Sequence, residues 1–374
     1  MDGSTHSLLT LISGLVANGV NVCVAGPNGD IINKKISVLG AKYYPVKIVR
    51  SIYPASDDTW KSKIKIVRLC RYAKKWICLP PKKLISYFEI CKIIKTVNPD
   101  IVHTNTGVVR EGFWAAKRYN IPHVWHLREY QDKEYNRSIY PCKRIFERML
   151  CCSYVITITD DLRKHFNLLN SPKSITIYNG ISYSKHLEFR WPKKKQFLCA
   201  SRIVPYKGHN RVIQAFAKFY RLHPDYHLVI LGFGQQDWIE KLKRQAQALG
   251  CEKAVRWEGY KEDVFEYMSD SMGLIVASTF EGFGRMTAEA CFAGCLPIGM
   301  NNSGTKEIIE KTGGFLFDTE DELFSQMQVV SSLSKERYRC LISRAQNISS
   351  NLFSIEQNID NTFSFYNRII VASR

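Results

Sequence analysis

The sequence lacks any long apolar run, and this argues against a membrane-spanning protein. No window of the 374 residues approaches the roughly 18 uninterrupted apolar residues that a membrane-spanning helix needs. The most apolar stretches, Leu228–Leu231 and Gly273–Ala277, have the length of buried strands. No cleavable signal peptide with a basic leader is visible, which predicts a cytoplasmic location.

The twelve cysteines lack the spacing of a metal site or of a disulfide framework. Cys291 and Cys295 do not form the C-x-x-C pair of a zinc knuckle, and the sequence has no second such pair that could complete a zinc site. Several of the other cysteines lie inside apolar runs, which favours reduced thiols in the core. We therefore expect no metal ion.

Acidic residues are scarce relative to basic ones. The sequence has 34 Asp and Glu against 53 Lys and Arg, a formal net charge of +19. This excess indicates an acidic partner: a nucleic acid, a phosphorylated small molecule or an anionic membrane surface. Nucleic-acid binding has no support beyond charge, because zinc-finger spacing, a basic zipper and the aromatic signature of RNA-binding sheets are all missing.

The positive charge is concentrated in residues 41–95. This segment has 14 Lys and Arg against 3 Asp and Glu, with aromatic residues such as Tyr53, Trp60 and Trp76 between the charges. One interpretation is a solvated helical face. The other is an interfacial patch that attracts anionic lipid headgroups, each cation contributing about 1 kcal/mol.

Short apolar strands alternate with amphipathic helical stretches, which predicts an α/β fold with parallel sheets. A chain of this length suggests two domains. The polar, basic segment 183–195 has the composition of a linker. We predict an N-terminal domain over 1–185, a C-terminal domain over 186–355, and a final helix over 356–374 that packs back toward the N-terminal domain.

The strongest chemical signal is the segment 278–290, in which Glu281 and Glu289 flank a glycine-rich loop and the start of a helix. Gly282 and Gly284 allow backbone amides to come close to a ligand, and a helix N-terminus favours anionic groups. The loop carboxylate of Glu281 can accept hydrogen bonds from sugar hydroxyls, and that of Glu289 can take two neighbouring ribose hydroxyls. The alternative is that both glutamates are solvated caps.

Two further clusters follow predicted strands. Arg202 and Lys207 lie five residues apart around a proline-containing loop, an arrangement that suits a diphosphate, although both could be surface charges. Gly232-Phe233-Gly234 begins like a dinucleotide-binding fingerprint, but Asp237 occupies the place of the third glycine. The second cluster therefore argues against a nicotinamide oxidoreductase.

Together these segments resemble the family 4 glycosyltransferases of the GT-B type, over nearly the whole chain. The matching segments are Asn179-Gly180, Arg202, Lys207-Gly208, Gly232-Phe233-Gly234, Asp263-Val264, the Glu281 and Glu289 pair, and Gly304 with Glu307-Ile308-Ile309. The resemblance implies two Rossmann-like domains facing across a cleft. It also implies retaining transfer of a sugar from a UDP- or GDP-linked donor to a glycan or lipid-linked acceptor, without a metal or other cofactor.

The resemblance also implies roles for individual residues. Arg202 and Lys207 would hold the donor diphosphate, Glu289 the ribose and Glu281 the transferred sugar. The backbone of Gly282, Phe283 and Gly284 would line the same pocket.

In the first half of the chain, His126 matches the strand-end histidine of the family and would face the transferred sugar, and His103 is a weaker candidate. Gly3 and Ser4 match the glycine loop that opens the first helix of these enzymes. The chain begins where the first strand of the family should end, so the resemblance implies a first sheet that lacks this strand.

The sequence thus predicts a hexosyltransferase for surface polysaccharide or glycolipid synthesis, cytoplasmic and peripheral on the inner face of the cell membrane through residues 41–95. A homologue that binds sugar nucleotides without catalysis is the main alternative. A basic nucleic-acid-binding protein is a minor one.

Overall fold

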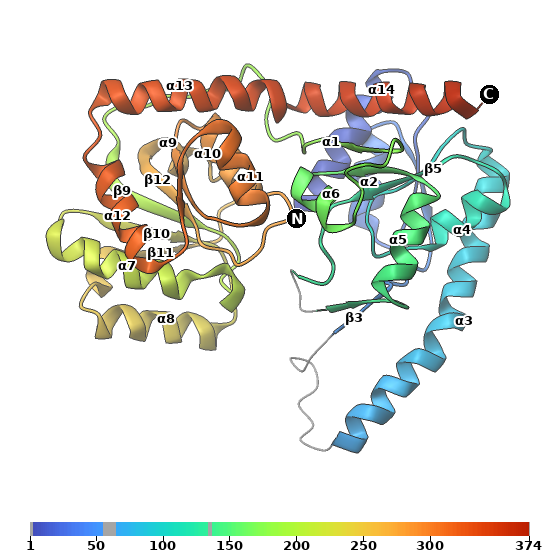
Figure 1. The fold of residues 1–374 in the computed structure, drawn as a ribbon, viewed down its shortest axis with the longest axis horizontal. Helices are drawn as coiled ribbons and strands as arrows, with labels where there is room; N and C mark the ends of the chain where they lie inside the picture. Colours follow the sequence, from blue (N-terminus) through green and yellow to red (C-terminus); the bar gives the residue numbers. More distant parts are fainter. Residues whose placement is uncertain (1–2, 55–64, 134–136, 374) are drawn as a thin grey trace. The chain divides into compact units, whose positions relative to one another are not determined.

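The computed structural model describes residues 3–54, 65–133 and 137–373. The chain forms two compact units (Figure 1). Unit 1 comprises Met1–Tyr178 and Asn358–Arg374, and unit 2 comprises Asn179–Gln357. Both units are α/β and contain parallel sheets, which confirms the predicted fold class.

Unit 2 contains one parallel sheet of six strands, in the order β11-β10-β9-β12-β13-β14. Counted along the chain from β9, this order is 3-2-1-4-5-6, the order of the Rossmann nucleotide-binding sheet. The order reverses between β9 and β12, so the loops that follow these two strands meet at the carboxyl edge of the sheet. The strands are β9 (Lys194–Ala200), β10 (His227–Leu231), β11 (Val255–Gly259), β12 (Ser271–Val276), β13 (Leu296–Met300) and β14 (Phe315–Phe317).

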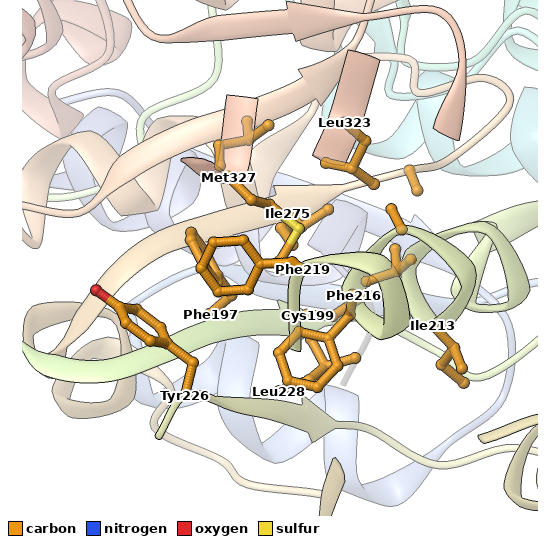
Figure 2. Packing of buried hydrophobic residues seen from close by; sticks show 14 of the residues in the cluster. Phe197, Cys199, Ile213, Phe216, Phe219, Tyr226, Leu228, Ile275, Leu323 and Met327 are labelled. Carbon is orange, nitrogen blue, oxygen red and sulfur yellow. The ribbon is translucent and has the colours of Figure 1, made fainter. Parts of the chain in front are cut away.

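Both faces of this sheet are buried, which explains why its strands read as continuous apolar runs. Phe197 and Cys199 point to one face, into a core of aromatic and aliphatic side chains (Figure 2), while Leu198 and Ala200 point to the other. The first face packs against α7 (His209–Leu222), α8 (Gln236–Ala248), α12 (Glu320–Ser331) and α13 (Lys335–Leu352). The second packs against α9 (Phe265–Asp270) and α10 (Arg285–Phe292).

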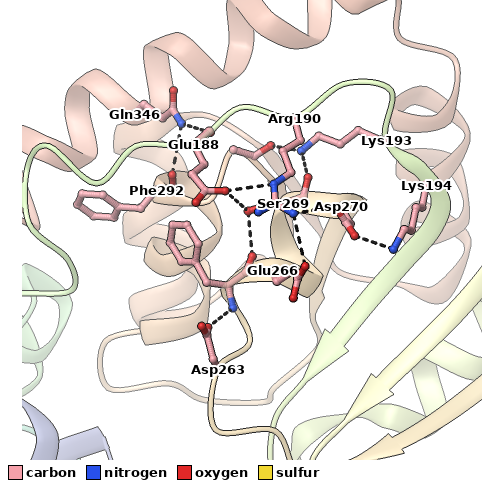
Figure 3. Close-up of polar contacts among 12 residues, drawn as sticks. Glu188, Arg190, Lys193, Lys194, Asp263, Glu266, Ser269, Asp270, Phe292 and Gln346 are labelled. Carbon is pink, nitrogen blue, oxygen red and sulfur yellow. Dashed lines mark hydrogen bonds and ion pairs between the residues drawn. The ribbon is translucent and has the colours of Figure 1, made fainter.

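The segment 183–195, expected to be a linker, instead makes hydrogen bonds and ion pairs with the rest of unit 2 (Figure 3). Lys193 is 7% exposed, and its Nζ donates to the carbonyl oxygens of Ser269 at 2.5 Å and Gly294 at 2.7 Å. These carbonyls compensate for the desolvation of the ammonium group. Further contacts along the segment are Arg190–Asp270, Lys194–Asp270 and Glu188–Gln346.

The strands of unit 1 are divided among three sheets. A four-stranded parallel sheet has the order β4-β5-β7-β8, β1 pairs with β2 in parallel, and β3 pairs with β6 antiparallel. The strands are β1 (Cys23–Gly26), β2 (Lys42–Pro45), β3 (Ile52–Pro54), β4 (Val102–Thr104), β5 (His123–Leu127), β6 (Arg137–Ile139), β7 (Tyr154–Thr157) and β8 (Ser174–Thr176).

The last helix, α14 (Ile355–Ser373), packs on the four-stranded sheet of unit 1. Its Phe365 and Ile369 lie in one cluster with Val124 and Ile156 of the sheet. The other helices of unit 1 are α1 (Gly3–Ala17), α2 (Asp30–Val38), α3 (Lys65–Val97), α4 (Glu111–Arg118), α5 (Lys143–Cys151) and α6 (Asp160–His165). The remaining helix of unit 2 is α11 (Ser303–Thr312).

Most of the basic segment 41–95 falls in β2, β3 and α3, and residues 55–64 of it, which include Trp60, lie outside the described part of the chain. Within the described ranges, no helix has the length and apolar character that crossing a membrane requires.

Candidate active site

The loops that follow β9 and β12 touch at the carboxyl edge of the unit 2 sheet. The amide of Thr279 donates to the carbonyl oxygen of Tyr206 at 2.9 Å. Gly208 makes this approach possible, because a Cβ at this position would lie 2.2 Å from the carbonyl oxygen of Ala277. Its φ of +72° also lies in the left-handed region that favours glycine. The reversal of strand order therefore brings the two predicted ligand-binding loops together.

Side chains from these two loops form an ion pair. Lys207 Nζ lies 2.5 Å from Glu281 Oε1, and the two side chains are 14% and 22% exposed. Arg202 is an exposed residue of the same loop. Its Nη2 donates to Tyr206 Oη at 3.0 Å. Three residues predicted from two separate motifs therefore gather at one place, with two cations and one carboxylate.

The glycine-rich loop that carries Glu281 is held in place by the start of α11. The amide of Glu281 donates to Ser303 Oγ at 3.0 Å, and the amide of Gly304 donates to the Glu281 carbonyl oxygen at 3.0 Å. Gly284, at φ +84°, precedes the first residue of α10. The loop therefore has a fixed backbone course at the N-terminus of α10, where the helix dipole favours an anion.

Glu289 lies on α10, one helical turn after Arg285. Arg285 Nε lies 2.7 Å from Glu289 Oε1. Burial raises the pKa of Glu289 and the carboxylate of Asp263 adds to this rise, whereas the cation of Arg285 opposes it. This contact involves one of the two carboxylate oxygens of Glu289.

Two exposed aromatic residues at the same edge of the sheet were not predicted as functional. Phe233 follows β10 and Tyr260 follows β11, and they are 58% and 59% exposed. Their ring centroids lie 5.9 Å apart, with the planes at 69°. The carbonyl oxygen of Phe233 accepts from the amide of Ile203, next to Arg202, at 2.8 Å. The pair therefore adjoins the loop that carries the predicted diphosphate cations.

The edge of the unit 2 sheet thus combines three kinds of group. Cations suit a diphosphate, carboxylates suit the hydroxyls of sugar and ribose, and aromatic faces suit a planar base. Glu289 lies on α10, and the other groups lie in loops after neighbouring parallel strands, where α/β sheets bind nucleotides.

His126, the predicted site residue of unit 1, lies near the carboxyl end of β5 and is fully buried. Arg128 Nη2 lies 3.4 Å from His126 Nδ1, and the ring of His103 lies 5.3 Å from the ring of His126. Burial, followed by the Arg128 cation, holds the pKa of His126 well below its usual value. A pKa lowered in this way favours the uncharged imidazole at neutral pH, and the contact of His126 with a sugar stays a prediction.

Gly3 and Ser4, predicted to form a glycine loop, are the first two residues of α1. The carbonyl oxygen of Gly3 accepts from Ser7 Oγ at 3.0 Å, a contact within the helix. The structure therefore places these residues in the first turn of the helix rather than in a loop before it, and their role stays a prediction.

Two family models match consecutive parts of the chain. The model of glycosyltransferase family 4 matches residues 1–185, and the model of glycosyl transferases group 1 matches residues 185–346.

Curated relatives are also glycosyltransferases. An uncharacterized glycosyltransferase of Haemophilus influenzae is 28% identical, covering 70% of this chain and 79% of that protein. The capsular polysaccharide biosynthesis glycosyltransferase CapH of Staphylococcus aureus is 22% identical, covering 76% and 81%. The alpha-monoglucosyldiacylglycerol synthase of Acholeplasma laidlawii is 20% identical, covering 88% and 89%.

The fold is shared with a solved structure, that of HepE of Anabaena in complex with UDP. The TM-score is 0.76 at 18% identity, and the superposition covers 98% of this chain and 96% of that one. The two family models, the relatives and the Rossmann-like order of the unit 2 sheet agree with one another. The chain belongs to the family 4-like glycosyltransferases with the GT-B fold.

Proposed function

We propose that this glycosyltransferase moves a hexose from a UDP- or GDP-linked donor to a hydroxyl of a glycan or lipid-linked acceptor, with retention of configuration. The observation that carries the proposal is the meeting of Arg202, Lys207 and Glu281 in the loops after β9 and β12. A diphosphate beside the two cations places its sugar near the carboxylate of Glu281. The chemistry of this cluster matches the two ends of a sugar nucleotide.

The proposed reaction exchanges one bond at the anomeric carbon for another. The acceptor oxygen forms its bond to this carbon on the face from which the diphosphate departs, and the acceptor proton passes to a leaving phosphate oxygen. Negative charge grows on the diphosphate as its bond to the sugar breaks. Arg202 and Lys207 stabilise that charge, and we propose that they thereby make a divalent cation unnecessary.

Glu289 and the aromatic pair complete the proposed nucleotide site. The carboxylate of Glu289 accepts hydrogen bonds from the ribose hydroxyls. Phe233 and Tyr260 stack on the base, since exposed aromatic faces bind planar heterocycles. Glu281 contacts the transferred sugar.

Removal of the aromatic pair should weaken nucleotide binding without affecting the diphosphate. Base stacking on an aromatic side chain contributes about 1–3 kcal/mol, so Phe233→Ala with Tyr260→Ala should raise the Kd of UDP about 10–100-fold. The Kd of inorganic pyrophosphate should stay within about twofold of the parent. Calorimetric titration with both ligands measures this difference.

Tyr183→Ala is the matched control, since Tyr183 is a 51% exposed aromatic residue of unit 2 outside the sheet edge. Equal weakening of UDP binding in the control, or unchanged UDP binding in the double variant, would contradict the stacking role.

The acceptor side of the proposal includes a membrane surface. Leu84, Ile85 and Phe88 are 54%, 48% and 54% exposed on α3, and the exposed Lys92 and Lys95 fall on the same helix face. Apolar side chains flanked by lysines on one helix face suit the interface of an anionic membrane. We propose that this α3 stripe docks the enzyme on the inner face of the cell membrane, where a lipid-linked acceptor would lie.

Replacement of apolar side chains of the α3 stripe by carboxylates should weaken membrane binding. Each buried apolar side chain contributes about 1.5–3 kcal/mol, so Leu84→Asp with Phe88→Asp should reduce the fraction bound to vesicles at least about tenfold. Sedimentation with vesicles of phosphatidylglycerol and phosphatidylcholine measures this, and hydrolysis of a soluble donor should be unchanged.

A control with the same change of charge is Leu222→Asp with Val329→Asp, two apolar residues of unit 2 that are 60% and 44% exposed. If the control pair detaches the enzyme as strongly as the α3 pair does, membrane docking through α3 is wrong.

A donor screen tests the proposed function itself. The full chain is incubated with a panel of UDP- and GDP-linked hexoses in the presence of EDTA, and release of UDP or GDP is measured. Turnover of at least one donor is expected, with the anomeric configuration of the donor retained in the transfer product. The absence of turnover across the panel, with or without vesicles carrying lipid acceptors, would contradict the proposal.

A further inference from the structure

Two side chains that the proposed function assigns to different ends of the donor are bonded to each other in unit 2. Lys207 Nζ lies 2.5 Å from Glu281 Oε1, and the two side chains are 14% and 22% exposed. The proposed function gives Lys207 to the diphosphate and Glu281 to the transferred sugar. Each residue therefore has one partner within the protein and another in the donor.

The backbone of both residues is held in place, so a change of partner involves only their side chains. The amide of Lys207 donates to the carbonyl oxygen of Val204 at 3.0 Å, which closes a 3₁₀ turn. The amide of Glu281 donates to Ser303 Oγ, and its carbonyl oxygen accepts from the amide of Gly304, both at 3.0 Å. The carboxylate of Glu281 takes no part in these contacts, so its replacement should leave the loop folded.

Arg202, the other cation assigned to the diphosphate, has no such carboxylate partner. Its Nη2 donates to the hydroxyl of Tyr206 at 3.0 Å, and within the described ranges no carboxylate lies at ion-pair distance from it. The charge of Arg202 is therefore available to an incoming anion, whereas the charge of Lys207 is balanced by Glu281. A diphosphate would meet Arg202 first.

A diphosphate and the carboxylate of Glu281 then compete for Lys207. An ammonium group has three N–H donors and could contact both anions at once. The carboxylate and a phosphate would in that case lie side by side, and like charges repel more strongly where water is partly excluded. Both side chains of the pair are mostly buried, so solvent screens this repulsion only in part. Contact of Lys207 with one anion at a time is therefore favoured.

We propose that donor binding exchanges the partners of this ion pair. The diphosphate takes Lys207, and the carboxylate of Glu281 that is thereby released turns to the sugar hydroxyls. This rests on the proposed function and adds an order to it, because Glu281 contacts the sugar only after the diphosphate has displaced it. After transfer, the product nucleotide offers no sugar to Glu281, so the ion pair re-forms and favours release of the product.

Glu281→Gln tests the exchange, because it removes the competing charge and keeps the size of the side chain. Pyrophosphate, UDP and GDP should each bind about 3–10-fold more tightly than to the parent, since an ion pair of this exposure no longer opposes them. Calorimetric titration of the full chain measures the three Kd values. The kcat for sugar transfer should at the same time fall at least about tenfold, because the sugar loses a charged acceptor. A residue that only contacts the sugar would leave the affinity for pyrophosphate unchanged.

Glu310→Gln is the matched control, since it removes the same charge from a lysine pair of unit 2. Glu310 pairs with Lys306 on the surface of α11, with an N–O distance of 3.7 Å. This control should keep the Kd of pyrophosphate and kcat within about twofold of the parent. Equal tightening in both variants would show a general effect of net charge and would overturn the exchange. Unchanged or weaker binding of pyrophosphate by Glu281→Gln would overturn it as well.

A crystal structure of the full chain with pyrophosphate tests the geometry. Lys207 Nζ should contact a phosphate oxygen, and Glu281 Oε1 should lie more than about 4 Å from it, beyond ion-pair distance. An intact ion pair beside bound pyrophosphate would overturn the exchange, because Lys207 would then hold both anions together.

Failure of the exchange and failure of the proposed function give different results. If the parent binds pyrophosphate, UDP or GDP and Glu281→Gln gains no affinity, only the exchange is lost. If the parent binds none of the three ligands, the nucleotide site itself is wrong, and the exchange is wrong with it.

Discussion

Replacement of Arg202 by alanine should lower kcat for sugar transfer about 10²–10³-fold, equivalent to about 3–4 kcal/mol of transition-state stabilisation. Arg202 is exposed and its guanidinium bonds to Tyr206 Oη, so removal of the side chain leaves the core of unit 2 intact. The lost donor acts where charge develops on the leaving diphosphate. Steady-state kinetics with the best donor measure the effect.

Lys207→Ala should show a loss of the same order, with an added cost because Glu281 loses the partner that lies 2.5 Å from its carboxylate. Lys195→Ala removes a cation of unit 2 that is 63% exposed and paired with Asp225, and it should leave kcat unchanged. Turnover of Arg202→Ala within threefold of the parent would exclude the diphosphate role of that residue.

Replacement of Glu289 by glutamine should weaken binding of UDP or GDP about 10–100-fold. Hydrogen bonds to a charged acceptor contribute about 1.5–3 kcal/mol, and glutamine has one acceptor oxygen where the carboxylate has two. Binding of pyrophosphate should change less than threefold, since pyrophosphate has no ribose. Calorimetric titration with nucleotide and pyrophosphate distinguishes the two effects.

The same residue should make nucleotide binding depend on pH. Burial raises the pKa of Glu289 above its usual value, so protonation of the carboxylate begins at a higher pH than for an exposed glutamate. Affinity for UDP should therefore fall as pH falls through this raised pKa, and the fall should be absent in Glu289→Gln.

Glu310→Gln provides the control, because Glu310 pairs with Lys306 at the same i, i+4 spacing on α11 but at the surface. A Glu289→Gln variant that binds UDP as tightly as this control does would remove Glu289 from the ribose site.

The unit 2 site was largely predictable because its residues follow strands. Arg202, Lys207 and Glu281 each come shortly after a short apolar run, and the carboxyl ends of parallel strands meet at one edge of a sheet. The same rule applies to Phe233 and Tyr260, for which the sequence predicted no role. Their exposure, rather than their position, identifies them as candidate binding residues. Exposure depends on the packing of loops that are far apart in the sequence.

Unit 1 was less predictable for a physical reason. Tyr366 lies 263 residues from the His103 that it contacts, so no local pattern connects them. The antiparallel pair β3 and β6 has only three residues in each strand, too few for a periodic signal. The segment 183–195 has the composition of a linker, yet Lys193 is buried. Two carbonyl groups of unit 2 accept hydrogen bonds from its ammonium group, which offsets the cost of burying the charge.

Titration of the full chain with UDP and GDP in the presence of EDTA tests the central claim most directly. The account predicts saturable binding of at least one of these nucleotides without a divalent metal ion, at least about tenfold weaker in Arg202→Ala and unchanged in Lys195→Ala. Absence of binding by both nucleotides, or equal binding by the parent and Arg202→Ala, would contradict the assignment of the nucleotide site to the edge of the unit 2 sheet.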